Sequence, residues 1–501
     1  MTPQVLEDLL RLKGPSLSSE LGQQLVARGL SEEAARQRMS RAKGEVRRLE
    51  GFHFPNREKF LFLSGQFKSP SFLANLSEAL IKTNSAYGQF LLGLESQGGF
   101  LLSSQSSIAT GLPIAPTKGH ILHESAASKL EEFGLIETFQ TGNGEEVIRL
   151  KDPADSIDRW RSVKVAEDIA LDAVLSWLGK MGFSSPGVTK IRDGETCPSF
   201  GQFSWDVVGP SYLSTLTGTS PAGVKNGFFV CDVSLGRTVT LRSLKPFLAK
   251  WDSLRWQKRA TRFQPMILGK FFEPAALAEL RKRGCIVALP KTLFGEDGAA
   301  ALLELISTVE NAAVAVRKNP EAVFEMLRRV AKLEGTARNL SGVVLELLVG
   351  HLYHLKGYNI DISKVIYDEQ RRPADIDVRA RNHAELVFCE CKAKGPGTLV
   401  NDYEIRHWLD NRVPRMKSWA KLQSEAPRAI RFEFYSTTGF TDDAKSLIEH
   451  VKQTHKKQPI TFIDGAGIVD ELYHFHQSKL IDMFREQFGD SRELNAQAKA
   501  S

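Results

Sequence analysis

The chain has 501 residues, of which 42% are hydrophobic and 25% are charged, and its formal net charge is +7. This composition excludes a disordered chain, and the length predicts three or four domains. The mild excess of basic residues fits a polyanionic partner, although many basic proteins bind none.

Cysteine usage and the absence of long apolar runs indicate where the protein works. The five cysteines form no C-x-x-C pair, which favours a reducing compartment and argues against a zinc ribbon. The first 14 residues contain acids and no long apolar run, unlike a signal peptide. No segment reaches the ~18 uninterrupted apolar residues of a membrane span. We therefore expect a soluble cytoplasmic protein with no membrane partner.

The first 66 residues predict three helices and a β-hairpin. The third helix should begin at Ser31 and is rich in arginine, and residues 51–63 should form a hairpin around a Pro-Asn turn. This order resembles a winged helix-turn-helix module, whose third helix enters a DNA groove. The alternative is a solvated basic helix in a protein-interaction module. The resemblance implies DNA contacts from the third helix and the wing tip by Arg36, Arg38, Arg41, Lys43, Arg47, Arg48, Arg57 and Lys59.

Residues 67–152 predict a second module of the same kind. Helices are expected at 85–99, 103–113 and 120–137, followed by a hairpin that turns at residues 142–144. The stretch 129–137 resembles the end of a winged-helix third helix running into its wing. This copy is less basic, so we expect it to position or dimerise the protein rather than to read bases.

Two longer segments, 153–295 and 336–485, follow one common plan. Each contains a long apolar helix ending at a glycine, two strands that each carry an acid, a basic helix with tryptophan, and a closing strand–helix–strand unit. Residues 296–335 between them predict a helical linker broken at Asn319 and Pro320. Residues 486–501 predict a polar tail.

The strand predicted at residues 384–392 carries a carboxylate and an amine on one face and apolar side chains on the other. Alternation of side chains puts Glu390 and Lys392 on one face with Phe388. The opposite face, expected to pack into the core, carries Val387, Cys389 and Cys391.

A second acidic strand lies just before it. Asp375 and Asp377 are expected to share one face, with Ile376 and Val378 on the other. The short link between the two strands should bring their acids together. Glu346 lies in an otherwise apolar helix, where a carboxylate is rarely tolerated unless it is paired or binds a metal.

An Asp followed by Glu-x-Lys on adjacent strands, after a helix with a glutamate, resembles the PD-(D/E)xK nuclease superfamily, which has the restriction-endonuclease-like fold. The closing segment 434–472 looks like Mrr-type members. The resemblance implies that Asp377, Glu390 and Glu346 bind Mg²⁺, with Mn²⁺ as the alternative, and that Lys392 orients or helps to deprotonate the attacking water. Asp375 competes with Asp377 for the first role.

The first copy departs from this pattern. Asp206 matches the first acid, Asp232 and Ser234 replace the Glu-x-Lys pair, and Asp172 lies near the place of Glu346. Since serine cannot supply the charge of the lysine, we expect a degenerate domain that binds nucleic acid or imitates a second subunit. Phosphate contacts are expected from Arg255, Lys258 and Arg259, and the alternative is amphipathic packing of that helix.

The predicted fold is therefore multidomain: two α+β winged helix-turn-helix modules, then two restriction-endonuclease-like α/β domains, the first degenerate. The predicted function is a metal-dependent DNA endonuclease of bacterial restriction or anti-phage defence, which family membership implies would leave 5′-phosphate and 3′-hydroxyl ends. Two alternatives remain open: a DNA-binding regulator or assembly protein that uses these folds as scaffolds, and an RNA nuclease. The expected partner is duplex DNA, and a homodimer or a defence-system protein is left open.

Overall fold

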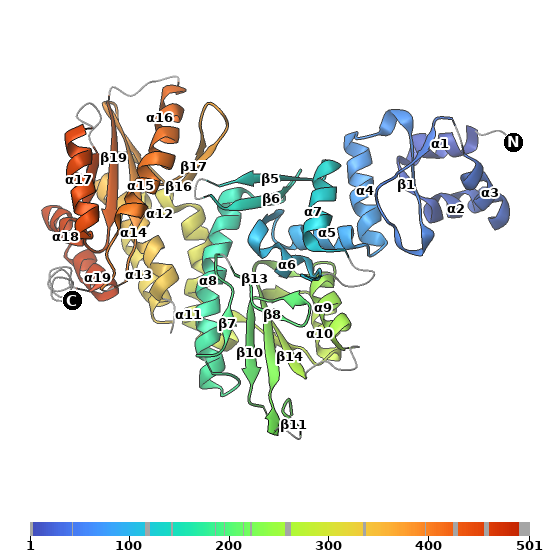
Figure 1. Ribbon diagram of the computed structural model, residues 1–501, viewed down its shortest axis with the longest axis horizontal. Helices are drawn as coiled ribbons and strands as arrows, with labels where there is room; N and C mark the ends of the chain where they lie inside the picture. Colours follow the sequence, from blue (N-terminus) through green and yellow to red (C-terminus); the bar gives the residue numbers. More distant parts are fainter. Residues whose placement is uncertain are drawn as a thin grey trace.

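The computed structural model shows a multidomain, mixed α/β protein with several small sheets (Figure 1). The N-terminal units form an arm on one side, and the last α/β domain lies on the other. The structure describes residues 4–42, 44–115, 121–141, 144–185, 187–194, 196–213, 215–220, 223–255, 262–333, 337–395, 397–423, 429–454 and 460–489.

The first unit contains three helices and a small antiparallel sheet of order β1-β3-β2. The helix–helix–helix–hairpin order matches the expectation, with β1 as an additional strand, and the winged-helix assignment itself stays a prediction. Its elements are α1 (Gln4–Lys13), β1 (Ser16–Leu17), α2 (Ser18–Ala27), α3 (Glu32–Arg41), β2 (Val46–Arg48), the 3₁₀ turn η1 (Pro55–Arg57) and β3 (Phe60–Leu63).

The third helix is shorter than expected. It ends at Arg41, since Ala42 already has a non-helical backbone (φ −58°, ψ 127°), and Gly44 takes a left-handed φ of 82° before β2 begins. Arg47 and Arg48 therefore lie on β2 and not on the helix, which corrects the sequence-based placement.

The second unit repeats the order, with a sheet of order β4-β6-β5. One hydrophobic cluster joins the two units, and Phe52 of the first contacts Tyr87 and Phe133 of the second at ring-centroid distances of 4.7 and 4.6 Å. Two 3₁₀ turns, η2 (Ser64–Gln66) and η3 (Ser103–Gln105), accompany α4 (Pro70–Lys82), α5 (Ala86–Ser96), β4 (Phe100–Leu102), α6 (Ser106–Thr110), α7 (His123–Glu132), β5 (Ile136–Gln140) and β6 (Glu146–Leu150).

The two α/β domains have sheets of the same topology. Their strand orders are β7-β10-β13-β14-β15 and β16-β17-β18-β19-β20, and in each the first three strands are antiparallel and the last three parallel. The repeated plan read from the sequence is therefore present in the fold.

The first α/β domain contains α8 (Ile157–Lys180), β7 (Lys190–Ile191), β8 (Ser199–Phe200), β9 (Phe203–Ser204), β10 (Val207–Ser211), β11 (Gly218–Ser220), β12 (Gly223–Lys225), β13 (Gly227–Val239), α9 (Lys245–Arg255), β14 (Phe263–Phe272), α10 (Pro274–Lys282) and β15 (Ile286–Ala288). The second contains α14 (Ala337–Leu355), β16 (Asn359–Tyr367), β17 (Pro373–Arg381), β18 (Glu385–Lys392), α15 (Asp402–His407), the π-helical turn η4 (Trp408–Arg412), α16 (Val413–Lys421), β19 (Ala429–Ser436), α17 (Asp442–Thr454), β20 (Ile460–Ile463), α18 (Gly465–His474) and α19 (Ser478–Phe488).

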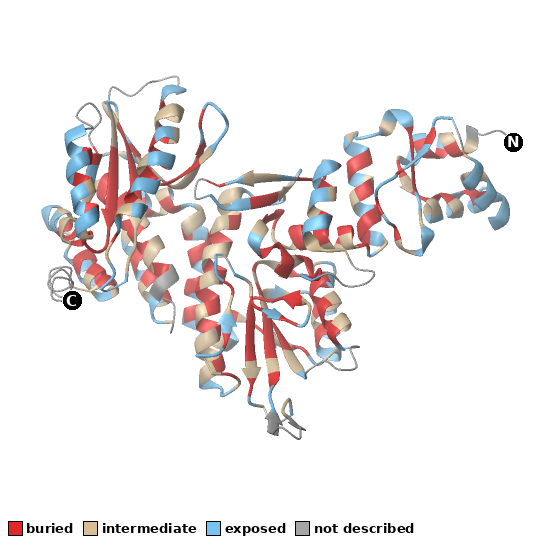
Figure 2. Cartoon of the chain, in the orientation of Figure 1, coloured by how far each residue is buried: buried red, intermediate tan, exposed pale blue. Residues whose placement is uncertain are grey.

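The segment between these domains is part of a shared core. Its helices α11 (Pro290–Glu310), α12 (Ala312–Lys318) and α13 (Pro320–Ala331) join α8 and α14 in one continuous hydrophobic cluster, which reaches both sheets (Figure 2). Gly350 lets α14 lie close to β16, because a Cβ there would be 2.5 Å from Ile362 Cδ1. Within the described residues no single helix is long and apolar enough to cross a membrane, and α11 and α12 pass that test only as a pair bent by 103°.

Two expectations about the acidic strands need correction. Both faces of β18 are covered, because Phe388 is buried in the cluster under α15 and α16 while Val387 and Cys389 belong to the shared core. On β17, Ile376 packs in the cluster under α15 and α16, whereas Val378 packs in the shared core. Simple alternation therefore fails at Asp377, where β17 no longer pairs with β18 and Ser363 of β16 has a φ of 53°.

Candidate active site

The candidate site lies where β17 and β18 separate. Their last paired residues on this side are Val378 and Cys389, so the next residues, Asp377 and Glu390, lie at the point of divergence. Asp377 Oδ2 accepts a hydrogen bond of 2.6 Å from the backbone N–H of Cys391. The expected convergence of these two acids is therefore present.

Glu390 is a buried carboxylate with two cationic partners. It is 1% exposed, and Arg412 Nη1 lies 2.8 Å from its Oε1 and 2.5 Å from its Oε2. Lys392 Nζ lies 3.1 Å from Oε1. Arg412 ends the π-helical turn η4, just before Pro414, whose missing N–H cannot continue an α-helical hydrogen-bond ladder.

Lys392 remains an ammonium in this environment. Burial acts to lower the pKa of Lys392, but Glu390 and Asp377 outweigh it, so the pKa is raised above the usual value for lysine. The side chain is 34% exposed. This arrangement suits the stabilisation of negative charge better than the removal of a proton from water.

Glu346 projects from α14 toward the same acids. It accepts a hydrogen bond from the Ser363 hydroxyl. Burial, with repulsion from Glu390, raises the pKa of Glu346 to about 7 despite that hydrogen bond. Burial and repulsion from Glu390 and Glu346 likewise raise the pKa of Asp377 well above its usual value. Burial and the neighbouring carboxylates therefore favour the protonated forms of Glu346 and Asp377.

Asp375 has a different environment. Arg161 of α8, in the other α/β domain, places Nη2 2.6 Å from Asp375 Oδ1. From the sequence alone Asp375 competed with Asp377 for the first role, whereas in the structure Arg161 pairs with Asp375.

A cavity of about 270 Å³ separates α8 from this cluster. Carboxylates and cations of both α/β domains line it, together with Glu145 from the β5–β6 hairpin of the second N-terminal unit. Its polar and charged lining residues are Glu145, Arg161, Lys164, Asp168, Glu346, Ser363, Asp375 and Asp377.

The donors fit a hard divalent cation in kind. Carboxylate oxygens are the ligands that Mg²⁺ prefers, and Asp377 is near enough to Glu390 and Glu346 for both to raise its pKa. Within the described part of the chain, however, no three His, Cys, Asp or Glu side chains stand close enough to hold a metal ion. To ligate a cation, Asp377 must release the proton that its raised pKa favours, and Glu390 must exchange part of its ion pair with Arg412.

The first copy has the same backbone arrangement. Its strands diverge after the Val207–Cys231 pair, and Asp206 Oδ2 accepts a hydrogen bond of 2.7 Å from the backbone N–H of Val233. Asp232 corresponds to Glu390, and its cationic partner also comes from the next helix, where Lys250 Nζ of α9 lies 2.5 Å from Asp232 Oδ2. The predicted equivalence of Asp206 and Asp232 with the acids of the second copy agrees with this geometry.

Two features of the first copy differ from the expectation. Glu167, not Asp172, is the acid of α8 that lines this site, together with Ser234. Arg192 is almost fully buried among acids, with Asp206 at 2.6 Å, Asp168 at 2.8 Å and Glu167 at 3.5 Å. The acids of this copy are therefore neutralised from within the domain.

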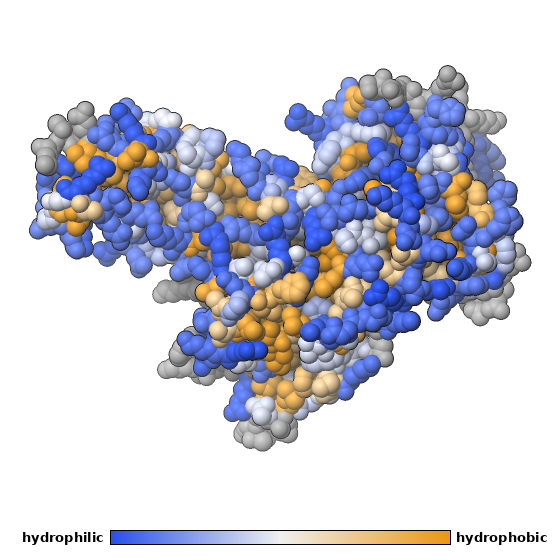
Figure 3. Space-filling view, turned by 180° about the vertical axis from the view of Figure 1, so that it is seen from behind, coloured by the Kyte–Doolittle hydropathy of each residue, from blue (hydrophilic) through white to orange (hydrophobic). Residues whose placement is uncertain are grey.

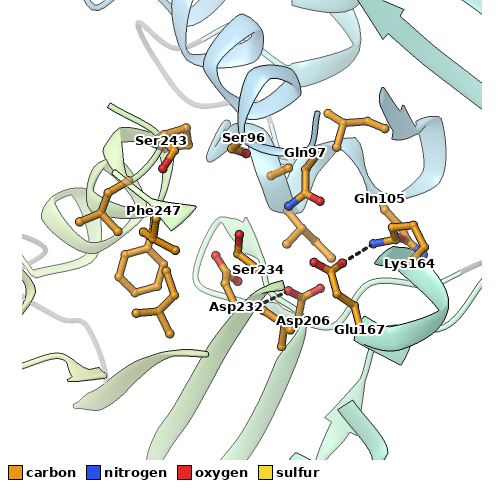
Figure 4. A pocket seen from close by; sticks show the side chains of 18 of the residues that line it. Ser96, Gln97, Gln105, Lys164, Glu167, Asp206, Asp232, Ser234, Ser243 and Phe247 are labelled. Atoms are coloured by element: carbon orange, nitrogen blue, oxygen red, sulfur yellow. Dashed lines mark hydrogen bonds and ion pairs between the residues drawn. The ribbon is translucent and has the colours of Figure 1, made fainter. Parts of the chain in front are cut away.

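The second N-terminal unit closes this site. Figure 4 shows Glu167, Asp206 and Asp232 pointing toward one another beneath Gln97 and Gln105 of that unit. The remaining cavity is about 70 Å³, room for two or three waters but not for a nucleotide. This closure concerns the acid site alone, and the expectation that the domain binds nucleic acid through the helix around Arg255 stays a prediction.

The cations of the first copy also hold the N-terminal unit in place. Arg192 Nη1 donates to Gln105 Oε1 at 2.9 Å, and Lys250 Nζ donates to the carbonyl oxygen of Ile108 at 3.2 Å. Gly111 touches the start of α9, since a Cβ there would be 2.2 Å from the Pro246 carbonyl oxygen. We call this contact, formed by the acids of the first copy, Arg192, Lys250 and residues 105–111, the joint.

The residues proposed to contact DNA are widely spread. Arg36, Arg41, Arg57 and Lys59 are exposed, and Arg38 is half-buried. Arg48 donates to the carbonyl oxygens of Met39 and Ser40, which gives it a role in closing the end of α3. Arg255 is exposed at the end of α9, and Lys43, Lys258 and Arg259 lie outside the described residues.

Sequence reasoning missed the cations that partner the acids. Arg412 follows Glu390 by 22 residues, and Lys250 follows Asp232 by 18, each in the helix after the third strand. Aligning the two copies on their strand acids could have suggested this pair. No comparison of the two copies could have suggested Arg161 or Arg192. Asp375, the partner of Arg161, is 214 positions away, and the acids around Arg192 lie on or beside other elements.

Comparisons with known proteins leave the family open. No protein-family model matches the chain, and no curated protein matches it. Solved structures with some likeness include the protein of unknown function AF1548 (14% identity, 31% of this chain and 95% of that one, TM-score 0.20). A second is the restriction endonuclease FokI, with 11% identity over 89% of this chain and 81% of that one and a TM-score of 0.19. A third is FokI bound to DNA, with 13% identity over 56% of this chain and 58% of that one and a TM-score of 0.14. These TM-scores are too low to carry an argument about fold or function.

Proposed function

We propose that the C-terminal α/β domain is a metal-dependent nuclease that hydrolyses phosphodiester bonds of DNA. The observation that carries this proposal is the cluster of Asp377, Glu390 and Glu346 with Lys392 at the divergence of β17 and β18. Burying several like charges together is costly, and such clusters are characteristic of functional sites.

The residues divide the chemistry between them. Asp377 and Glu390, with Glu346, would hold Mg²⁺ or Mn²⁺, which supplies charge neutralisation at the phosphate and an activated water. The Lys392 ammonium, exposed on one side, would stabilise negative charge that develops on the phosphate. Arg412, which contacts both oxygens of Glu390, would hold this carboxylate in place.

DNA as the substrate is supported by the basic N-terminal unit. Exposed arginines of α3 and the wing lie on the arm, and the surface is hollowed between this arm and the C-terminal domain (Figure 3). A role in restriction or anti-phage defence comes from the family resemblance alone. RNA is the alternative substrate, because a basic surface does not distinguish the two sugars.

A second function has one observation in its favour. Both oxygens of Glu390 are held by Arg412, so the cluster as it stands is compensated by protein cations. This favours a DNA-binding regulator or assembly protein that keeps nuclease-like folds as scaffolds.

The test compares Lys392→Ala with Lys394→Ala on the same chain segment. Lys394 pairs with Glu404 at 2.7 Å and is 23% exposed, so it controls for loss of a partly buried lysine. Purified variants are incubated with duplex DNA or RNA, with and without added Mg²⁺. We expect Mg²⁺-dependent cleavage of DNA, lowered about 10²–10⁴-fold by Lys392→Ala and little changed by Lys394→Ala.

Two results would contradict the nuclease assignment. Cleavage by Lys392→Ala at the wild-type rate would remove the activity from this site. DNA binding with no cleavage in Mg²⁺ or Mn²⁺ would favour the scaffold function instead.

A further inference from the structure

Arg161 is a fixed contribution of the first α/β domain to the site of the second. Its contact with Asp375 joins residues more than 200 positions apart, and the two side chains are only 22% and 9% exposed. The start of α8 is held against β16 by an ion pair between Asp158 and Lys364. The guanidinium is thus held in place by two independent contacts between the domains.

In the two copies an arginine pairs with aspartates at different positions of the site. In the first copy, Arg192 binds Asp206, the aspartate that accepts the backbone N–H beside the strand acid. In the second copy, Asp377 has this position, and within the described residues it forms no ion pair. The arginine there binds Asp375 instead.

We propose that Arg161 is a positioning residue that occupies Asp375 and leaves Asp377 as the aspartate that binds the divalent cation. This inference rests on the proposed nuclease function and deepens it. A carboxylate paired with a guanidinium must give up that partner before it can ligate a cation, whereas Asp377 needs no such exchange. The first α/β domain therefore serves the site of the second without chemistry of its own.

The experiment measures Mn²⁺ binding to the full chain by calorimetry, in the absence of DNA. Asp377→Asn should weaken binding by at least about tenfold, and Asp375→Asn should change it by less than about threefold. In an Arg161→Gln background Asp375 loses its contact with this guanidinium, so the Arg161→Gln/Asp377→Asn double variant should bind Mn²⁺ about tenfold more tightly than Asp377→Asn alone. Circular dichroism confirms that each variant is folded.

Arg159 provides the matched control. It lies on the same helix with 25% side-chain exposure and pairs with Glu310 at 2.9 Å, away from the site. The Arg159→Gln/Asp377→Asn variant should bind Mn²⁺ no better than Asp377→Asn.

The outcomes separate this inference from the proposed function. Equal losses for Asp375→Asn and Asp377→Asn overturn the inference while leaving a metal site, and so does a double variant no better than Asp377→Asn. A wild-type chain that binds no Mn²⁺ overturns both. If Arg161→Gln does not fold, the comparison of the two aspartate variants alone still decides, because it leaves Arg161 in place.

Discussion

Replacing Lys250 with methionine should loosen the joint without touching the candidate active site. The Lys250 ammonium is completely buried, 2.5 Å from Asp232 Oδ2 and 3.1 Å from the Ser204 carbonyl oxygen, and it lies 4.0 Å from the centre of the Trp205 ring. Methionine preserves most of the packing but leaves the Asp232 carboxylate without its cation. Removing one partner of a buried pair costs about 3–5 kcal/mol.

Amide hydrogen exchange of α6 and β13 is the suitable assay, because it reports local opening in a chain of several domains. A cost of this size corresponds to exchange faster by roughly two to four orders of magnitude. Lys250→Met/Asp232→Asn should recover much of the loss, since it removes both charges, and Lys245→Met on the exposed side of α9 should have little effect. Unchanged exchange in Lys250→Met would refute the view that this ion pair holds the joint.

Three further predictions concern the first copy and the DNA reader. Asp232→Ala should leave the cleavage rate at saturating DNA unchanged, and a loss as deep as that of Lys392→Ala would show that both copies cleave. Burial raises the pKa of Asp232 to about 6. Because the folded carboxyl binds its proton more tightly than the unfolded one, stability should fall by up to about 3 kcal/mol as pH rises from about 4 to about 6, then level off. Since Glu346 and Asp377 also have raised pKa values, urea unfolding across this range should show a fall in both proteins, smaller in Asp232→Asn by up to about 3 kcal/mol. Charge reversal at Arg38 and Arg41 should weaken duplex binding and flatten its salt dependence, and identical affinities and slopes across a salt series would instead indicate a protein ligand for this unit.

The strand acids could be placed from the sequence because strand geometry is local. On β18 the alternation of side chains correctly separated Glu390 and Phe388 from Val387 and Cys389. The same rule failed on β17, since alternation assumes continuous pairing and the ladder with β18 ends at Val378. A single sequence carries no signal for where two strands separate.

The cations around these acids depend on tertiary packing, which explains why they were missed. Arg161 reaches Asp375 only because α8 and α14 share a core between the two sheets. Likewise, Arg192 joins three acids by folding back from the end of β7. The end of α3 was overestimated for a related reason, since the chain leaves the helix at Ala42 and Arg47 and Arg48 pair with β3, which overrides their helix propensity.

The first α/β domain, which has Ser234 where the second has Lys392, can keep its site acids for a structural reason. Asp206, Asp232 and Glu167 bind Arg192 and Lys250, and these two cations in turn bind Gln105 and Ile108 of the second N-terminal unit. Losing Asp232 would leave the buried Lys250 without its acid, and losing Asp206 or Glu167 would remove one of three acids around Arg192, so the cluster resists change even without catalysis. The same unit carries the β5–β6 hairpin, whose Glu145 lines the cavity beside Asp375 and Asp377. The joint therefore fixes what reaches the candidate active site, and a loosened joint should alter access to that site even though no residue within it has changed.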